Sequence, residues 1–181
     1  NDAPISDPIA LTTDEDTQLD FNVFVEGNVV DPDGQGGLTL VSVNGTAVTD
    51  GRLIATSEDG LLRVFTNGDI EFNLNGAFDA LDDGETVDDV LTVVFEDELG
   101  AQTTETVTIT VEGANDAPVP GFQFVPTDED TAVSGNVLTD FGASDPDGDD
   151  IFVSAVDGVA FTGATTFTTA SGDTFEIAAD G

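Results

Sequence analysis

Apolar residues alternate with polar residues along much of the chain. Four runs keep this period of two, and they are Leu19, Phe21, Val23 and Val25; Ile70, Phe72 and Leu74; Leu91, Val93 and Phe95; and Val107, Ile109 and Val111. Such a period is expected of a β-strand that buries one face, and threonine at many intervening positions favours sheet over helix. The pattern therefore predicts strands in all four places, and only residues 77–81 suggest a helical turn.

Turn dipeptides separate the apolar runs. They are Asn44-Gly45, Asp50-Gly51, Asp59-Gly60, Asn67-Gly68, Asn75-Gly76 and Asp83-Gly84. Asn, Asp and Gly tolerate the positive φ of tight hairpins, so each pair predicts a turn between strands. About seven strands then fit into residues 1–114, which predicts an all-β fold, an Ig-like or cadherin-like Greek-key β-sandwich. Asn44-Gly45-Thr46 also fits a glycosylation sequon, but a hairpin turn is the favoured interpretation.

The chain repeats itself at an offset of 114 residues. Asn1-Asp2-Ala3-Pro4 returns as Asn115-Asp116-Ala117-Pro118, and residues 1–34 share 15 identities with residues 115–148 without a gap. Most shared positions hold carboxylates, Asn, Pro or Gly, so the chemistry of loops and junctions is what recurs. These features predict a tandem array. Residues 1–114 would form a complete cadherin-like β-sandwich repeat, and residues 115–181 the N-terminal part of a second repeat.

The second repeat has no counterpart of residues 69–113, which hold the last three predicted strands. A truncated sandwich of this kind is expected to have open sheet edges and an uncovered apolar face. Two explanations stay open. Either the natural protein continues, so that the partners are neighbouring repeats of the same polypeptide, or another copy supplies strands through the open edges. Continuation is the favoured explanation.

Net charge excludes several classes of partner. The chain has 38 Asp and Glu residues against two basic residues and no His, which gives a net charge of -36. Nucleic acid and anionic membrane surfaces would repel such a chain. No apolar run is long enough to span a bilayer, so membrane insertion is not expected. The 39% of hydrophobic residues, including 13 Phe, are nevertheless enough to bury a core.

A folded chain of this charge needs bound cations or a high-salt medium to offset the repulsion among its carboxylates. Calcium is the predicted cofactor, because it takes roughly six to eight oxygen ligands and needs neither His nor Cys. Zinc and copper sites are not expected, because the chain has no His, Cys or Met to act as ligands.

Enzyme chemistry finds little support in the sequence. Without His or Cys, a nucleophilic triad has no base. The carboxylates lie in turns beside many like charges, which does not suit an acid–base pair with one raised pKa. With no Trp or Tyr, a sugar-stacking platform would depend on Phe122, Phe124 and Phe161, and Phe is more often a core residue. The chain is therefore predicted not to be an enzyme.

A series of motifs marks the second half of the first repeat. They are Gly68-Asp69-Ile70-Glu71-Phe72, Phe78-Asp79-Ala80-Leu81-Asp82-Asp83-Gly84-Glu85-Thr86, Leu91-Thr92-Val93-Val94-Phe95-Glu96-Asp97, Val107-Thr108-Ile109-Thr110-Val111-Glu112-Gly113 and Asn115-Asp116-Ala117-Pro118. Together they resemble the VCBS-type repeat of large secreted bacterial adhesins of the RTX class. The resemblance implies secretion or display at the bacterial cell surface, and a role in cell adhesion or biofilm formation.

The same landmarks resemble, more distantly, the order of calcium ligands in cadherin repeats. This resemblance implies that one junction between repeats is formed by Glu15, Glu85, Asn115, Asp116, Asp145 and Asp147. It places Asp2, Asp31, Asp33 and Asp97 at the opposite end of the first repeat. Glu112 and the recurring pair Asp128 and Glu129 complete the predicted metal ligands.

Each acidic motif also has a simpler interpretation. Asp31-Pro32-Asp33-Gly34 is a turn sequence in its own right, and Asp14-Glu15-Asp16-Thr17 could be solvated loop charge. Recurrence of both motifs in register with Asn-Asp-Ala-Pro favours a metal site. The sequence thus predicts calcium-stabilised extender repeats that stiffen the stalk of an adhesin. Two alternatives stay open: a calcium-dependent glycan- or ligand-binding module, and an acidic surface-layer or matrix protein of a halophile.

Overall fold

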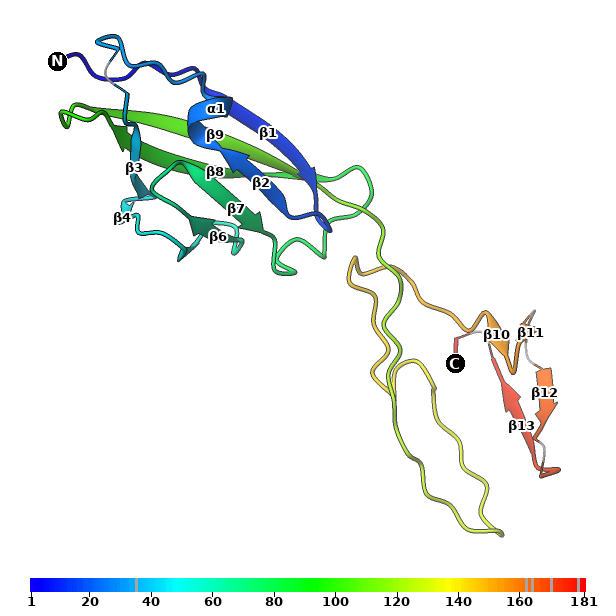
Figure 1. The fold of residues 1–181 in the computed structure, drawn as a ribbon. Coiled ribbons are helices and arrows are strands. Elements are labelled where there is room, and N and C mark those ends of the chain that lie inside the picture. The colour runs from blue at the N-terminus through cyan, green and yellow to red at the C-terminus, as the bar shows by residue number, and fades with distance from the viewer. Residues whose placement is uncertain (35, 162, 164, 170, 179) are drawn as a thin grey trace. The chain divides into compact units, whose positions relative to one another are not determined.

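The structure, a computed structural model, describes residues 1–34, 36–161, 163, 165–169, 171–178 and 180–181. It divides into two compact units, Asn1–Asn115 and Asp116–Gly181. The first unit is coloured blue to green in Figure 1, and the strands of the second are orange to red. The division falls inside the recurring Asn-Asp pair.

Two sheets form the first unit (Figure 1). One has five strands in the order β1-β9-β8-β3-β4, and the other has four in the order β2-β7-β6-β5. The strands are β1 (Ile9–Asp14), β2 (Leu19–Asn22), β3 (Thr39–Val43), β4 (Thr46–Ala47), β5 (Arg52–Ala55), β6 (Leu61–Val64), β7 (Asp69–Asn73), β8 (Thr86–Glu96) and β9 (Gln102–Glu112). β1 runs parallel to β9, and the other pairs of these strands are antiparallel.

The core of the first unit lies between the two sheets. The inward positions of β8 and β9 are fully buried, and they are Leu91, Val93, Phe95, Val107, Ile109 and Val111. From the smaller sheet, Ile70 and Phe72 on β7 and Leu62 and Val64 on β6 pack into the same cluster. Because alternate residues of a strand point to opposite faces, the apolar alternation in the sequence puts these side chains on one side. The predicted all-β sandwich is confirmed.

One of the four predicted strands ends early. β2 stops at Asn22, and a single helical turn, α1 (Val23–Glu26), follows it. The Asn22 side chain accepts hydrogen bonds from the backbone N–H groups of Phe24 (2.9 Å) and Val25 (3.3 Å) and so caps this turn. The strand prediction was wrong for Val23 and Val25, because the capping preference of Asn outweighed the apolar alternation.

The hairpin between β3 and β4 confirms the turn interpretation of Asn44-Gly45. Both residues have positive φ, 49° and 73°, as a two-residue hairpin turn requires. The described part of the first unit has nine strands, more than the about seven that the pattern predicts. β4 contains two residues only, too few for alternation to reveal.

The second unit repeats the hairpins β3–β4 and β5–β6 of the first unit, but its described residues include no strand that matches β1 or β2. It contains β10 (Ala155–Val156), β11 (Val159–Ala160), β12 (Thr165–Thr168) and β13 (Thr174–Ile177). β10 pairs with β11 and β12 with β13, as β3 pairs with β4 and β5 with β6. None of the described side chains of this unit is buried. Phe122 and Phe124 are 92% and 79% exposed, so the expectation that Phe lies in the core was wrong for these two.

The core of the first unit contains one buried carboxyl group that no predicted site uses. Asp89 points inward from β8 with no exposed surface. Its Oδ1 lies 3.5 Å from the Ser57 hydroxyl, and its Oδ2 has no hydrogen-bond partner among the described residues. Burial raises the pKa of Asp89, and the Glu58 carboxylate adds to this rise; the hydroxyls of Thr56 and Ser57 offset only part of it.

Asp89→Asn is expected to stabilise the first unit near neutral pH by about 1 kcal/mol, because it removes a buried charge without a full set of partners. The folded pKa lies above the unfolded value of 3.8, so the free energy of unfolding falls as the pH rises through the raised pKa. The variant should lose that part of the pH dependence. Urea unfolding across this pH window measures both effects. Asp88→Asn, at the exposed neighbouring position, is the control, and an equal gain from it would contradict the argument.

Candidate metal centre

The first acidic loop brings together three of the predicted ligands within the first unit. The backbone N–H of Asp2 donates to Oδ2 of Asp33 at 2.6 Å. The N–H of Asp33 donates to Oδ1 of Asp31 at 2.9 Å. Gly34 completes the turn with a φ of 67°, a conformation that Gly adopts without a steric cost. The loop therefore holds paired carboxylates in a fixed arrangement.

The second copy of this loop has the same hydrogen bonds within the second unit. The N–H of Asp116 donates to Oδ2 of Asp147 at 2.6 Å. The N–H of Asp147 donates to Oδ1 of Asp145 at 3.1 Å. The same two hydrogen bonds therefore recur in both copies of the acidic loop. A role that these side chains share in every repeat of the array would require such recurrence.

Asp97 contacts Asn1, the residue that precedes Asp2, although the two lie 96 positions apart in the sequence. It follows β8 and is 4% exposed. Its Oδ1 accepts hydrogen bonds from the N–H groups of Leu99 (2.8 Å) and Ala101 (3.0 Å) and from Nδ2 of Asn1 (3.3 Å). Its Oδ2 is buried and has no partner among the described residues. Burial acts to raise the pKa of Asp97, but these hydrogen bonds outweigh it and keep the pKa below its ordinary value.

Three glutamates gather at the opposite end of the first unit. Glu15 is 4% exposed, and its Oε1 accepts a hydrogen bond from the N–H of Ala114 at 2.8 Å. Its own N–H donates to the carbonyl of Glu112 at 3.0 Å. The carbonyl of Glu85 accepts from the N–H of Gly113 at 2.9 Å. The end of β9 therefore places the backbone of Glu15, Glu85 and Glu112 around one short segment.

Comparison with known proteins identifies the family. The model of the bacterial cadherin-like domain matches residues 1–113. The chain belongs to the bacterial cadherin-like family. None of the curated proteins matches the chain. Cadherin-like domains usually bind calcium, their fold is typically non-enzymatic, and the bacterial ones are extracellular. Among the described residues, no helix has both the length and the apolar character that crossing a membrane requires.

The acidic ends of this cadherin-like domain offer oxygen atoms as metal ligands. Asp2, Asp31, Asp33 and Asp97 supply carboxylates, and the buried Oδ2 of Asp97 has no hydrogen-bond donor among the residues that the structure describes. Carboxylate and carbonyl oxygens are the ligands that calcium prefers. A cation would satisfy this oxygen and reduce the repulsion between the neighbouring aspartates. The donor atoms of these residues therefore suit a hard divalent ion.

The remaining predicted ligands are Asp128 and Glu129, which belong to one local turn, and Asn115. Oδ1 of Asp128 accepts from the N–H of Asp130 at 3.1 Å, and the carbonyl of Asp128 accepts from Thr131. Hydrogen bonds from Thr131 and Asp130 lower the pKa of Asp128. Glu129 is exposed, and so is Asn115, the last residue of the first unit.

The contact between Asn1 and Asp97 was not predicted from the sequence. The amide of Asn1 reaches Asp97, which lies 96 residues away. The recurrence of Asn1 as Asn115 was the available signal, because Asn115 was included among the predicted ligands and Asn1 was not.

Gly113 packs closely against the loop before β8, at the end of the cadherin-like domain that contains Glu15, Glu85 and Glu112. A Cβ at this position would collide with the backbone carbonyl oxygens of Leu81 and Asp82. Gly113→Ala is therefore expected to destabilise the first unit by about 1–3 kcal/mol, because the loop before β8 must move. Chemical denaturation measures the effect. Gly36→Ala is the control, since its Cβ would meet no atom within 4 Å; equal stability of both variants would contradict the packing argument.

Proposed function

We propose that the chain is a calcium-stabilised extender segment of a secreted bacterial adhesin of the RTX class, built from VCBS-type cadherin-like repeats. The observation that carries the proposal is the buried Asp97 carboxylate, whose Oδ2 has no partner among the described residues. Asn1 donates to its Oδ1, and the next residue, Asp2, donates to Asp33 of the first acidic loop. The recurrence of the loop hydrogen bonds in the second unit supports it.

Electrostatic repulsion is the basis of the proposed mechanism. At a net charge of -36, each repeat is destabilised by repulsion between its carboxylates. Bound calcium would supply positive charge and link carboxylates that are distant in sequence. Asn115 and Asp116 directly follow the acidic end of the first repeat in the chain, so ions held by these linker residues would restrict bending between neighbouring repeats of the polypeptide. An array stiffened in this way would project a distal ligand-binding part of the adhesin away from the cell.

Calcium-dependent melting of the full chain tests this proposal. The melting temperature is compared in calcium, in magnesium, in sodium chloride of equal ionic strength and in EDTA. A gain from calcium alone supports a specific site. An equal gain from sodium chloride would instead support the acidic matrix protein of a halophile, in which charge serves solvation.

A calcium-dependent glycan-binding module is the second candidate function. It is favoured by the exposure of Phe122 and Phe124 in the second unit, since exposed aromatic rings can stack against sugars. Binding of the full chain to a glycan array distinguishes the two functions, because an extender segment needs no glycan ligand.

A further inference from the structure

Three Asn-Gly pairs lie in turns of the first unit. They are Asn44-Gly45, Asn67-Gly68 and Asn75-Gly76. Asparagine in such a pair can lose ammonia, because the backbone nitrogen of the next residue attacks the side-chain carbonyl carbon and Gly has no side chain to hinder the approach. The asparagine side chain must first leave its hydrogen bonds and bring these two atoms together. The surroundings of each pair therefore determine how readily it reacts.

The pair Asn44-Gly45 is held by strand β8. Oδ1 of Asn44 accepts a hydrogen bond from the backbone N–H of Thr92 at 2.9 Å. The N–H of Asn44 donates to the carbonyl of Thr92 at 2.8 Å. The Asn44 side chain must break the first of these bonds before its carbonyl carbon can approach the nitrogen of Gly45.

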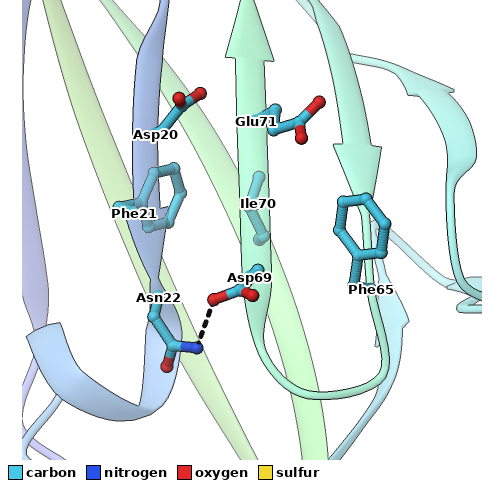
Figure 2. Close-up of a pocket in the computed structure, with 7 residues that line it drawn as sticks. All are labelled: Asp20, Phe21, Asn22, Phe65, Asp69, Ile70 and Glu71. Carbon is cyan, nitrogen blue, oxygen red and sulfur yellow. Dashed lines mark hydrogen bonds between the residues drawn. The ribbon is translucent and has the colours of Figure 1, made fainter.

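The pair Asn67-Gly68 is held more firmly. Nδ2 of Asn67 donates to Oδ2 of Asp69 at 2.7 Å, and Oδ1 of Asn67 accepts from the N–H of Asp69 at 3.2 Å. Figure 2 shows that the same carboxylate also accepts a hydrogen bond from Asn22, at 2.7 Å. Gly68 is buried, and its N–H donates to the carbonyl of Phe65 at 3.1 Å. The side chain and the attacking nitrogen of this pair are therefore both engaged.

The pair Asn75-Gly76 has neither restraint. Both residues are exposed. Among the described residues, neither the Asn75 side chain nor the N–H of Gly76 has a hydrogen-bond partner. The φ values of Asn75 and Gly76, 56° and 69°, are close to those of Asn44 and Gly45, 49° and 73°. These two pairs thus share their sequence and their turn conformation, and they differ in the hydrogen bond from Thr92.

We propose that Asn75 is a site of spontaneous deamidation in the folded protein. A bond forms between the backbone nitrogen of Gly76 and Cγ of Asn75. The bond between Cγ and Nδ2 breaks, and Nδ2 leaves as ammonia with the proton of the Gly76 N–H. Water then opens the cyclic imide. Cleavage of the new bond gives aspartate, whereas cleavage of the bond from the Asn75 backbone carbonyl carbon to the same nitrogen gives isoaspartate.

The product changes a groove that is already acidic. Asn75 lines this groove together with Glu15, Asp16 and Asp79. Asp79 is close to the reacting pair, since a Cβ at Gly76 would lie 3.0 Å from its Oδ2. Deamidation replaces a neutral amide by another carboxylate at this place, where like charges repel one another. Isoaspartate would also lengthen the main chain in the turn that follows β7. The reaction thus makes the groove more acidic as the protein ages.

Peptide mapping of the full chain by mass spectrometry, after incubation at mildly alkaline pH, tests the proposal. Cleavage before aspartate places the three sites in separate peptides, which are residues 33–49, 59–68 and 69–78. In the folded protein, Asn75 should convert about fivefold faster than Asn44, the factor that the net free energy of one hydrogen bond corresponds to. It should convert more than about tenfold faster than Asn67, whose amide donates to a charged group. An aspartate product adds a cleavage site before residue 75, and an isoaspartate product does not.

The chain unfolded in urea is the control. All three sites have the same Asn-Gly sequence, so without the fold they should convert at similar rates. Conversion of Asn44 or Asn67 in the folded chain as fast as that of Asn75 would overturn the proposal, and so would an unreactive Asn75. The same ranking in urea would also overturn it, because neighbouring residues in the sequence would then set the rates.

Discussion

Calcium at about 10 mM is expected to raise the melting temperature of the first unit by roughly 5–15 °C. Extracellular modules bind calcium with dissociation constants of roughly 0.1–1 mM, so this concentration stabilises the folded state by about 1.4–2.7 kcal/mol for each site. For a domain of this size, each kcal/mol shifts the midpoint by several degrees. Differential scanning calorimetry measures the shift.

Asp97→Asn is the matched variant for this experiment. It keeps the shape of the side chain but removes the negative charge that Asn1 contacts, next to the hydrogen bond from Asp2 to Asp33. The variant should lose most of the gain that the first unit obtains from calcium, because a charged ligand becomes neutral. Sodium chloride of equal ionic strength should stabilise both proteins equally and by less. The calcium site would be refuted if chloride salts of sodium and calcium produced the same shift at matched ionic strength.

Phe72→Ala is expected to destabilise the first unit by about 3–5 kcal/mol. Phe72 has no exposed surface and lies on β7, the strand between β2 and β6. Its ring meets Phe78 edge to face, with centroids 6.2 Å apart. Truncation removes this contact and leaves a cavity between the sheets, where close packing prevents full relaxation. This loss is a large fraction of the stability of a typical domain. Because the chain has no Trp, urea unfolding followed by circular dichroism measures it.

Phe122→Ala is the control for the core variant. Phe122 is 92% exposed in the second unit, so its truncation should change the free energy of unfolding of the first unit by less than about 0.5 kcal/mol. A comparable loss from both variants would show that burial does not determine the effect. An unfolded Phe72→Ala protein would still agree with the expectation, provided that the more conservative Phe72→Leu remains folded and loses a smaller amount.

Local patterns were the part of the fold that the sequence predicted well. The alternation in residues 107–111 and 91–95 corresponds to the buried faces of β9 and β8, because the pleat of a strand imposes its period on the side chains. The prediction failed at Val23 and Val25, where the side chain of Asn22 forms hydrogen bonds with the backbone that the strand pattern does not take into account. Capping competes with alternation over a few residues, and apolar periodicity carries no information about it.

The candidate site, like the fold, could be predicted from the sequence only in part. The pairing of Asp31 with Asp33 follows from their spacing, because an aspartate often accepts a hydrogen bond from the N–H two residues later. The resemblance to cadherin repeats had placed Asp97 near this loop. The burial of Asp97 and its contact with Asn1 came from the folded structure. The binding of calcium by these residues stays a prediction.

The sequence by itself determined that the protein is acidic, that it repeats, and that its strands and turns form an all-β sandwich. These properties depend on composition and on interactions between residues close together in the chain. Only the tertiary structure decided that β1 runs parallel to β9 and that Asp89 is buried in the core. Each of these depends on packing between segments that lie far apart in sequence, and hydrophobic burial sets no preference for one particular pairing until the sheets assemble.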